Sequence, residues 1–198
     1  MRKTSYFTVV ILLLTFVARA QKSYNDSIQA FIKHYVDTHE VVTGDDRKLL
    51  SFYPVNKNYR IVASFQRVKN GQWFTMETSG SSKQTFRVYG TIKFMIHDTT
   101  VQLNIYQSQK LMAVAEYKDN LFLPFTDLTS GEETYASGRY IDLVFDDIID
   151  NKVVIDFNKA YNPYCAYVTG RYNCPIPPGE NNLNVAILAG EKNYGKKH

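Results

Sequence analysis

The stretch FRVYGTIKFMIHDTTVQLNIY, Phe86 to Tyr106, alternates apolar and polar residues more regularly than any other part of the chain. Side chains of a strand point to opposite faces in turn, so this pattern predicts two antiparallel strands with one buried face. Their turn is expected at His97 to Thr99. The side chains expected on the buried face are those of Phe86, Val88, Ile92, Phe94, Ile96, Val101, Leu103 and Ile105. The hairpin therefore predicts a sheet that covers a core on one side.

Other strand-like runs flank this hairpin, at residues 59–68, 72–78, 121–125, 140–145, 153–157 and 184–188. Asn70-Gly71 predicts a hairpin between the first two runs, because both residues tolerate positive φ. Asp150-Asn151 predicts another between 140–145 and 153–157. About eight strands without helices between them predict a mainly β (α+β) fold, an antiparallel sandwich or a partly open barrel.

Helices are expected only near the N-terminus. Apolar residues at helical spacing predict a helix over residues 24–41 that packs against the sheet. A shorter helix is predicted over residues 45–52, because Pro54 ends it. No internal repeat or linker divides the chain after residue 20, so residues 21–198 are predicted to form a single β-rich domain.

The first 20 residues have the layout of a signal peptide. A basic head precedes an apolar run, and Ala18-Arg19-Ala20 fits the cleavage pattern. We expect a mature chain that begins at Gln21 and is secreted or periplasmic, with no stable membrane insertion. Three basic residues leave with this segment, so the formal charge of +4 falls to +1 and no nucleic-acid partner is expected.

Both cysteines, Cys165 and Cys174, lie in the stretch YNPYCAYVTGRYNCPIPPGENN, residues 161–182. In an exported chain this pair predicts a disulfide. Two buried thiols or a metal or redox site are the alternatives, although no histidine lies nearby to complete a metal shell. The stretch could also form the wall of a ligand pocket.

None of the common catalytic or nucleotide-binding motifs occurs, and the four histidines are scattered, so neither a cofactor nor a metal is expected. Two polar loops, 129–142 and 158–181, are the candidates for a shared site that binds a small molecule. Arg139 is expected to organise this site by pairing with Glu133, Asp142 or Glu180. The candidate ligand-binding residues are Glu133, Tyr135, Arg139, Tyr161, Asn162, Glu180 and Asn181. Whether the protein catalyses a reaction stays open. The alternative of a structural or interaction module, in which these residues only hold long loops, also stays open.

Three blocks of the chain resemble the sequence pattern of an uncharacterised prokaryotic family, domain-of-unknown-function family 1684. They are TSGEETYASGRYIDL from Thr129, DFNKAYNPYCAY from Asp156 and CPIPPGENNLNVAILAGEK from Cys174. Ile141 and Ile176 replace leucines of that pattern. The resemblance implies a bacterial or other prokaryotic protein, but no established activity. It also implies that the loops 129–142 and 158–181 belong to one family signature.

Overall fold

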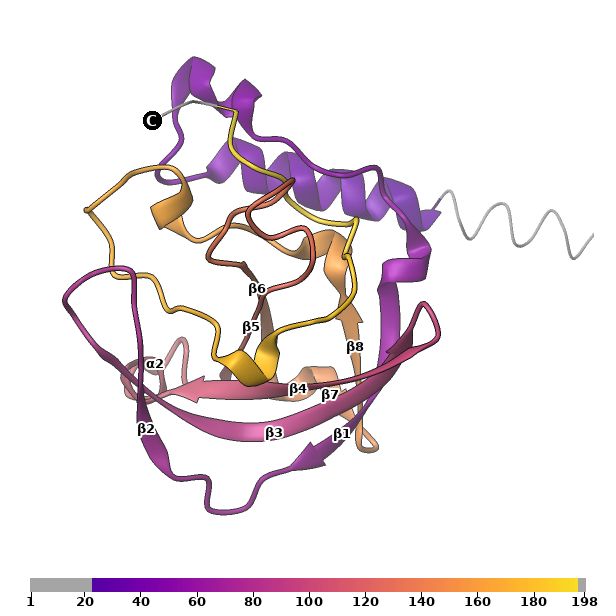
Figure 1. Ribbon diagram of the computed structural model, residues 1–198, viewed down its shortest axis with the longest axis vertical. Coiled ribbons are helices and arrows are strands. Elements are labelled where there is room, and N and C mark those ends of the chain that lie inside the picture. The colour runs from indigo at the N-terminus through magenta and orange to yellow at the C-terminus, as the bar shows by residue number, and fades with distance from the viewer. Residues whose placement is uncertain (1–22, 196–198) are drawn as a thin grey trace, which may run out of the picture.

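The protein folds around one antiparallel sheet, seen in a computed structural model that describes residues 23–195 (Figure 1). The strand order is β6-β5-β4-β3-β1-β8-β7, with β2 also paired to β3, and the sheet does not close into a barrel. The strands are β1 Arg60–Arg67, β2 Trp73–Met76, β3 Gln84–Ile96, β4 Thr99–Ser108, β5 Asn120–Phe125, β6 Arg139–Val144, β7 Ile148–Ile149 and β8 Lys152–Asp156. The predicted mainly β class is confirmed.

The hairpin of β3 and β4 is the longest pairing in the sheet, as predicted. His97 and Asp98 form its two-residue turn, both with positive φ. The register shifts between Val88 and Gly90, which leaves one extra residue on β3. Such a bulge reverses the faces of the residues before it. Phe86 therefore leaves the core of Ile92 and packs with Met76 and Tyr106 on the other face of the sheet, contrary to the prediction.

Two predicted hairpins are wrong. β1 and β2 do not pair with each other, because both pair with β3, one beyond the other. Asn70, with φ of 58°, only redirects the chain between them. Asp150 and Asn151 do form a tight turn, but the strand before that turn is the short β7, whereas β6 pairs with β5.

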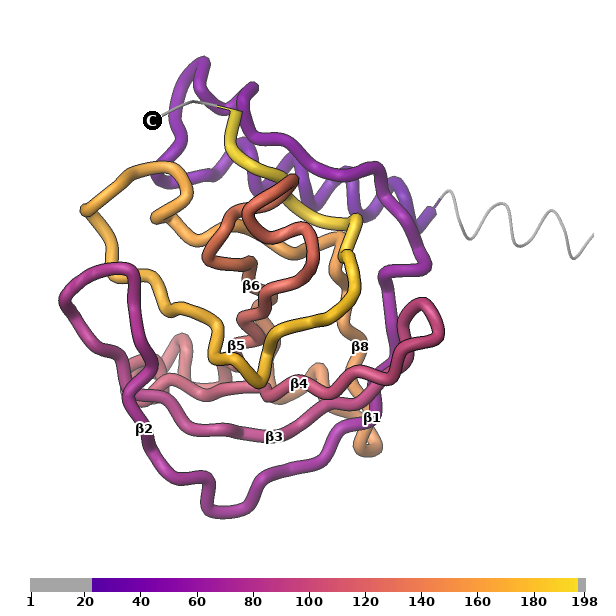
Figure 2. The backbone as a smooth tube through the Cα atoms, in the orientation of Figure 1, coloured from indigo at the N-terminus to yellow at the C-terminus, as the bar shows by residue number. Residues whose placement is uncertain are grey.

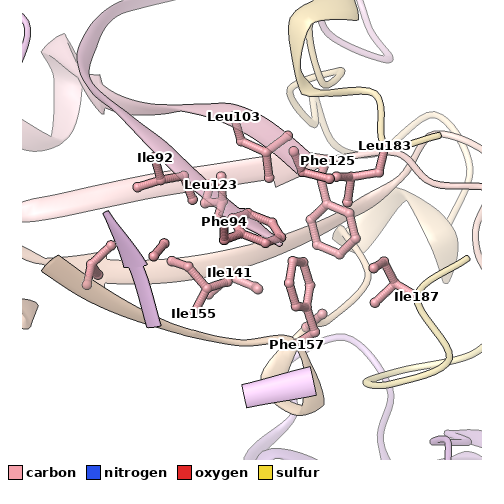
Figure 3. Packing of buried hydrophobic residues seen from close by; sticks show 14 of the residues in the cluster. Ile92, Phe94, Leu103, Leu123, Phe125, Ile141, Ile155, Phe157, Leu183 and Ile187 are labelled. Carbon is pink, nitrogen blue, oxygen red and sulfur yellow. The ribbon is translucent and has the colours of Figure 1, made fainter. Parts of the chain in front are cut away.

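The core lies on one face of the sheet (Figure 3). Side chains of β1, β3, β4, β5, β6 and β8 converge there with Phe157, Leu183 and Ile187 from outside the sheet. Phe125 and Phe157 meet edge to face with ring centroids 5.2 Å apart. The last predicted strand, 184–188, is irregular: Val185 and Ile187 enter this core and Leu188 is exposed, but the backbone pairs with no strand.

The N-terminal helix covers residues 23–38, three residues short of its predicted end. It ends where the ring Nδ1 of His39 accepts hydrogen bonds from the backbone N–H groups of Val41 and Val42. In Figure 1 the helix crosses the side of the molecule opposite β3. Tyr35 and Val36 contact the loop around Tyr167 and the C-terminal segment, so this end of the helix covers loops rather than strands.

Shorter helical pieces lie in the connections. The predicted second helix is the 3-10 turn η1, Gly44–Leu49, and a single α-helical turn, α2, covers Gln109–Met112. The remaining 3-10 turns are η2 Lys57–Tyr59, η3 Phe145–Asp147, η4 Phe157–Lys159, η5 Tyr164–Ala166 and η6 Gly179–Asn181. No helix among residues 23–195 has the length and apolar character needed to cross a membrane. The predicted signal peptide lies outside the described residues.

The buried side chain of Arg139 connects β6 to the loop that precedes it and to the C-terminal segment, residues 183–192, which runs beside that loop (Figure 2). The Arg139 and Asp127 side chains are both fully buried, and Nη2 lies 2.8 Å from Oδ2. The same guanidinium donates to the carbonyls of Ile187, Ala189 and Glu191, at 3.0, 2.5 and 3.2 Å. Arg139 is therefore paired with Asp127 rather than with any of the three carboxylates expected from the sequence.

We expect replacement of Arg139 to destabilise the protein strongly. Arg139→Met leaves the Asp127 carboxylate buried and unpaired, which should lower the free energy of unfolding by about 3–5 kcal/mol. Arg139→Lys should also be destabilising, because an ammonium group cannot reach a carboxylate and three carbonyls in one plane. Urea denaturation measures both.

Arg60→Met is the matched control, because Arg60 is an exposed residue at the start of β1. It should change the free energy of unfolding by less than about 0.5 kcal/mol. Equal effects of Arg139→Met and Arg60→Met would contradict the structural role of Arg139.

Candidate functional site

A cavity of about 750 Å³ lies on the face of β5 and β6 that points away from the core. Phe122 and Tyr140 reach it from these strands, whereas their neighbours Leu123 and Ile141 point into the core. The other walls come from β3, the α2 turn, the N-terminal helix and the loop 161–175. Six of its lining residues are tyrosines: Tyr35, Tyr117, Tyr140, Tyr161, Tyr164 and Tyr172.

Successive aromatic rings in contact form a continuous wall of the cavity. Phe86 stacks on Phe122 at 5.6 Å between centroids, and Phe122 meets Tyr140 edge to face at 4.7 Å. Tyr140 then meets Tyr161 at 5.8 Å, and Tyr161 meets Tyr35 at 6.1 Å. Because edge and tilted contacts fix each ring against the next, the wall has a defined shape without a ligand.

The disulfide predicted between Cys165 and Cys174 is present, with Cα atoms 6.3 Å apart. It closes the loop that supplies Tyr164 and Tyr172 to the cavity. The backbone of Cys174 also accepts a hydrogen bond from Ser79 N–H at 2.9 Å, which anchors the loop beside β2. The cysteine-containing stretch is therefore both a stapled loop and a cavity wall.

Asp142 and Tyr161 form the polar pair of the cavity. The Tyr161 hydroxyl donates to Asp142 Oδ2 at 2.6 Å. Protein atoms surround the carboxyl on most sides, and this desolvation raises the pKa of Asp142 although the Tyr161 bond acts in the opposite direction. The Asp142 side chain nevertheless stays accessible, because it opens into the cavity. Desolvation and the neighbouring Asp142 also raise the pKa of Tyr161.

A second, fully buried carboxylate lies behind the cavity at Glu191. It accepts hydrogen bonds from the Tyr167 hydroxyl at 2.7 Å, the Asn162 N–H at 2.8 Å and the Tyr35 hydroxyl at 3.1 Å. Burial raises the pKa of Glu191 to about 7 in spite of these donors. Tyr35 lines the cavity as well, so it connects this internal network with the cavity wall.

The structure divides the seven predicted site residues into four groups. Tyr161 lines the cavity, together with Asp142 of the other predicted loop. Arg139, Asn162 and Asn181 are fully buried: the two asparagines hold backbone groups of Lys192, Asn104 and Pro124. Glu133 and Glu180 are exposed, and Glu133 forms an ion pair with Lys192 at 3.4 Å. Tyr135 is half-buried among loop residues that include Val42 and Tyr167.

The two predicted loops do meet, and one of their contacts is made by the backbone. Tyr140 and Tyr161 exchange backbone hydrogen bonds of 2.9 and 3.1 Å, which places Tyr161 beside Asp142. The cavity residues that sequence reasoning missed are the strand aromatics, above all Phe122 and Phe86. The sequence does carry a signal for Phe122, because a large aromatic residue alternates with Leu121 and Leu123 and must lie on the opposite face.

We expect Glu191 to make the protein less stable as the pH rises. Its pKa is about 7 in the folded state against an ordinary value of 4.5, so the folded state binds the proton more tightly than the unfolded state. The resulting stabilisation is complete below about pH 4.5, is lost as the pH rises through about 7, and amounts to roughly 3 kcal/mol. Glu191→Gln should remove this component, which urea denaturation at a series of pH values measures.

Glu116→Gln serves as the control, because Glu116 is exposed and its substitution should leave the slope of stability against pH unchanged. If Glu191→Gln and the unsubstituted protein lose stability in parallel over this pH range, Glu191 does not titrate as described.

Comparison with known proteins supports the resemblance seen in the sequence. The solution NMR structure of an uncharacterised protein from Haloarcula marismortui is similar, with 27% sequence identity and a TM-score of 0.65. The similarity covers 88% of this chain and 96% of that one. No curated protein matches the chain.

The family model described as a protein of unknown function, DUF1684, matches residues 47–192. This range contains all three signature blocks, the buried Arg139–Asp127 pair and most of the cavity lining. The chain therefore belongs to the DUF1684 family.

Proposed function

We propose that the protein binds a small molecule in the aromatic cavity. The observation that carries this proposal is the convergence of the Asp142–Tyr161 pair and a wall of aromatic rings on one cavity of about 750 Å³. Ligand sites of proteins are commonly concave, about 300–1,000 Å³ in volume, and mostly apolar with a few placed polar groups. A smaller cavity of about 380 Å³ lies beside Val42 and Thr43, and neither Asp142 nor Tyr161 lines it.

The construction of the walls favours binding over a purely structural role. The disulfide holds one wall, Phe86, Phe122 and Tyr140 lie on strands, and Phe31 and Tyr35 lie on the N-terminal helix, so little conformational entropy is lost when a ligand enters. A structural role remains the better description of Arg139, Asn162 and Asn181, whose polar atoms hold neighbouring backbone. The signature of the family thus combines residues of the scaffold with residues of the proposed site.

We also propose that the protein acts outside the cytoplasm. The signal-peptide pattern of residues 1–20 supports this proposal, as does the disulfide between Cys165 and Cys174. Disulfides persist in oxidising compartments and are rare in the cytosol. The ligand would accordingly be one that the protein meets in the periplasm or the medium.

Filling the cavity should abolish binding of a neutral apolar probe. Leu111 of the α2 turn lines the cavity and is 36% exposed, so Leu111→Trp can place an indole in the opening without disturbing the core. The fluorescence of N-phenyl-1-naphthylamine should rise on titration into the unsubstituted protein, and Leu111→Trp should weaken this binding by about tenfold or more.

Leu128→Trp is the matched control, because Leu128 is 59% exposed and does not line the cavity. It should leave probe binding unchanged. If the probe does not bind, or if both tryptophan variants affect it equally, the cavity is not a ligand site.

A further inference from the structure

Most of the tyrosine hydroxyl groups around the cavity can offer a ligand acceptors rather than donors. Four of the six lining tyrosines already donate their hydroxyl protons to protein oxygens. The pairs are Tyr161 with Asp142 at 2.6 Å, Tyr164 with Glu40 at 2.9 Å, Tyr35 with Glu191 at 3.1 Å, and Tyr140 with the Pro175 carbonyl. A hydroxyl whose proton is committed can still accept through its lone pairs. A ligand that reaches these groups must therefore supply the donors.

Three of those four partners are carboxyl groups, which place negative charge around the cavity, although Glu191, with a pKa of about 7, is only partly ionised at neutral pH. Asp142 lies in the lining itself, whereas Glu40 and Glu191 lie outside the lining and accept hydrogen bonds from the hydroxyl groups of Tyr164 and Tyr35. An anionic ligand would meet both these charges and the hydroxyl lone pairs. The arrangement disfavours anions and favours a positively charged group.

Within the described residues, Asp142 has no cationic partner in the protein. Tyr161 is its hydrogen-bond partner, and this bond leaves Oδ1 unoccupied. Asp142 also forms no ion pair with any described lysine or arginine, although a carboxylate can accept several hydrogen bonds. Lys110 lines the same cavity, but its side chain is exposed on the α2 turn. A carboxylate that lines a cavity and has no cationic partner in the protein is a binding group for a cation.

The rings beside Asp142 suit a cation in a second way. Tyr140 and Tyr161 meet edge to face next to this carboxylate, and the faces of aromatic rings attract ammonium groups. The apolar remainder of the ligand would lie along Phe122 and Phe86, which continue the same wall.

We infer that the cavity binds an organic cation: a protonated amine carried on an apolar, ring-sized body, with its N–H groups at Asp142 and its body along the aromatic wall. This inference rests on the proposed binding function and adds the charge and shape of the ligand to it.

Three probes of nearly equal size and different charge test the inference: 2-phenylethylammonium, 2-phenylethanol and phenylacetate. Each is titrated against the mature protein by calorimetry, and by displacement of N-phenyl-1-naphthylamine. The ammonium probe should bind about tenfold more tightly than the alcohol, because a hydrogen bond to a charged group is stronger than one between neutral groups. Phenylacetate should bind most weakly.

Two variants test whether Asp142 is the source of the preference for the ammonium probe. Asp142→Asn should abolish the difference between ammonium and alcohol while N-phenyl-1-naphthylamine still binds, which shows that the cavity is intact. Asp146→Asn is the matched control, because Asp146 is an exposed carboxylate near the end of β6 that does not line the cavity. It should leave the preference unchanged.

The outcomes separate this inference from the proposal on which it rests. Binding of N-phenyl-1-naphthylamine without any preference for the ammonium probe, or with a preference that survives in Asp142→Asn, overturns the cation inference alone. Tighter binding of phenylacetate also overturns it and would make Lys110 the binding group. Failure of every probe, the neutral one included, overturns both.

Discussion

The buried ion pair between Arg139 and Asp127 is the interaction on which the irregular half of the molecule depends. The C-terminal segment lacks a strand partner, so its inward carbonyl groups need other donors. One guanidinium satisfies three of them, at residues 187, 189 and 191, and its positive charge is balanced by Asp127. Asp127 in turn accepts from the backbone N–H and hydroxyl of Thr129. The loop before β6 and the end of the chain are thereby fixed to each other.

The effect of this pair extends to the cavity through Glu191. The backbone of Glu191 is held by Arg139, and its carboxylate holds Tyr35, Tyr167 and the backbone of Asn162. Asn162 follows Tyr161, whose ring and hydroxyl belong to the cavity wall. The scaffold residues and the cavity residues thus belong to one hydrogen-bonded network, in which the charged groups are buried and the aromatic rings face the cavity. This explains why residues of both kinds occur in the same three sequence blocks.

Local sequence patterns predicted the parts of the fold that local interactions determine. The alternation in β3 and β4, the two-residue turn at His97 and the disulfide between Cys165 and Cys174 are all found as expected. The errors arise where distant partners decide the outcome. β1 and β2 both pair with the long strand β3 rather than with each other. The bulge before Gly90 turns the side chain of Phe86 to the face of the sheet away from the core. The segment 184–188 has the pattern of a strand, but side chains of Arg139 and Asp127 take the hydrogen bonds that a partner strand would take. For the same reason Arg139 was expected to bind a ligand: a sequence shows that an arginine needs a partner, but not that the partner is internal.

We propose that ligands enter the aromatic cavity on the outer face of β5 and β6 and leave the buried arginine network undisturbed. Chemical-shift mapping tests it most directly, with 2-phenylethylammonium titrated into 15N-labelled protein and the backbone amides followed by NMR. We predict that the shifted amides cluster in residues 84–86, 120–122, 140–142 and 161–175. Shifts concentrated instead in residues 127–139 and 187–191, around Arg139, would contradict this claim.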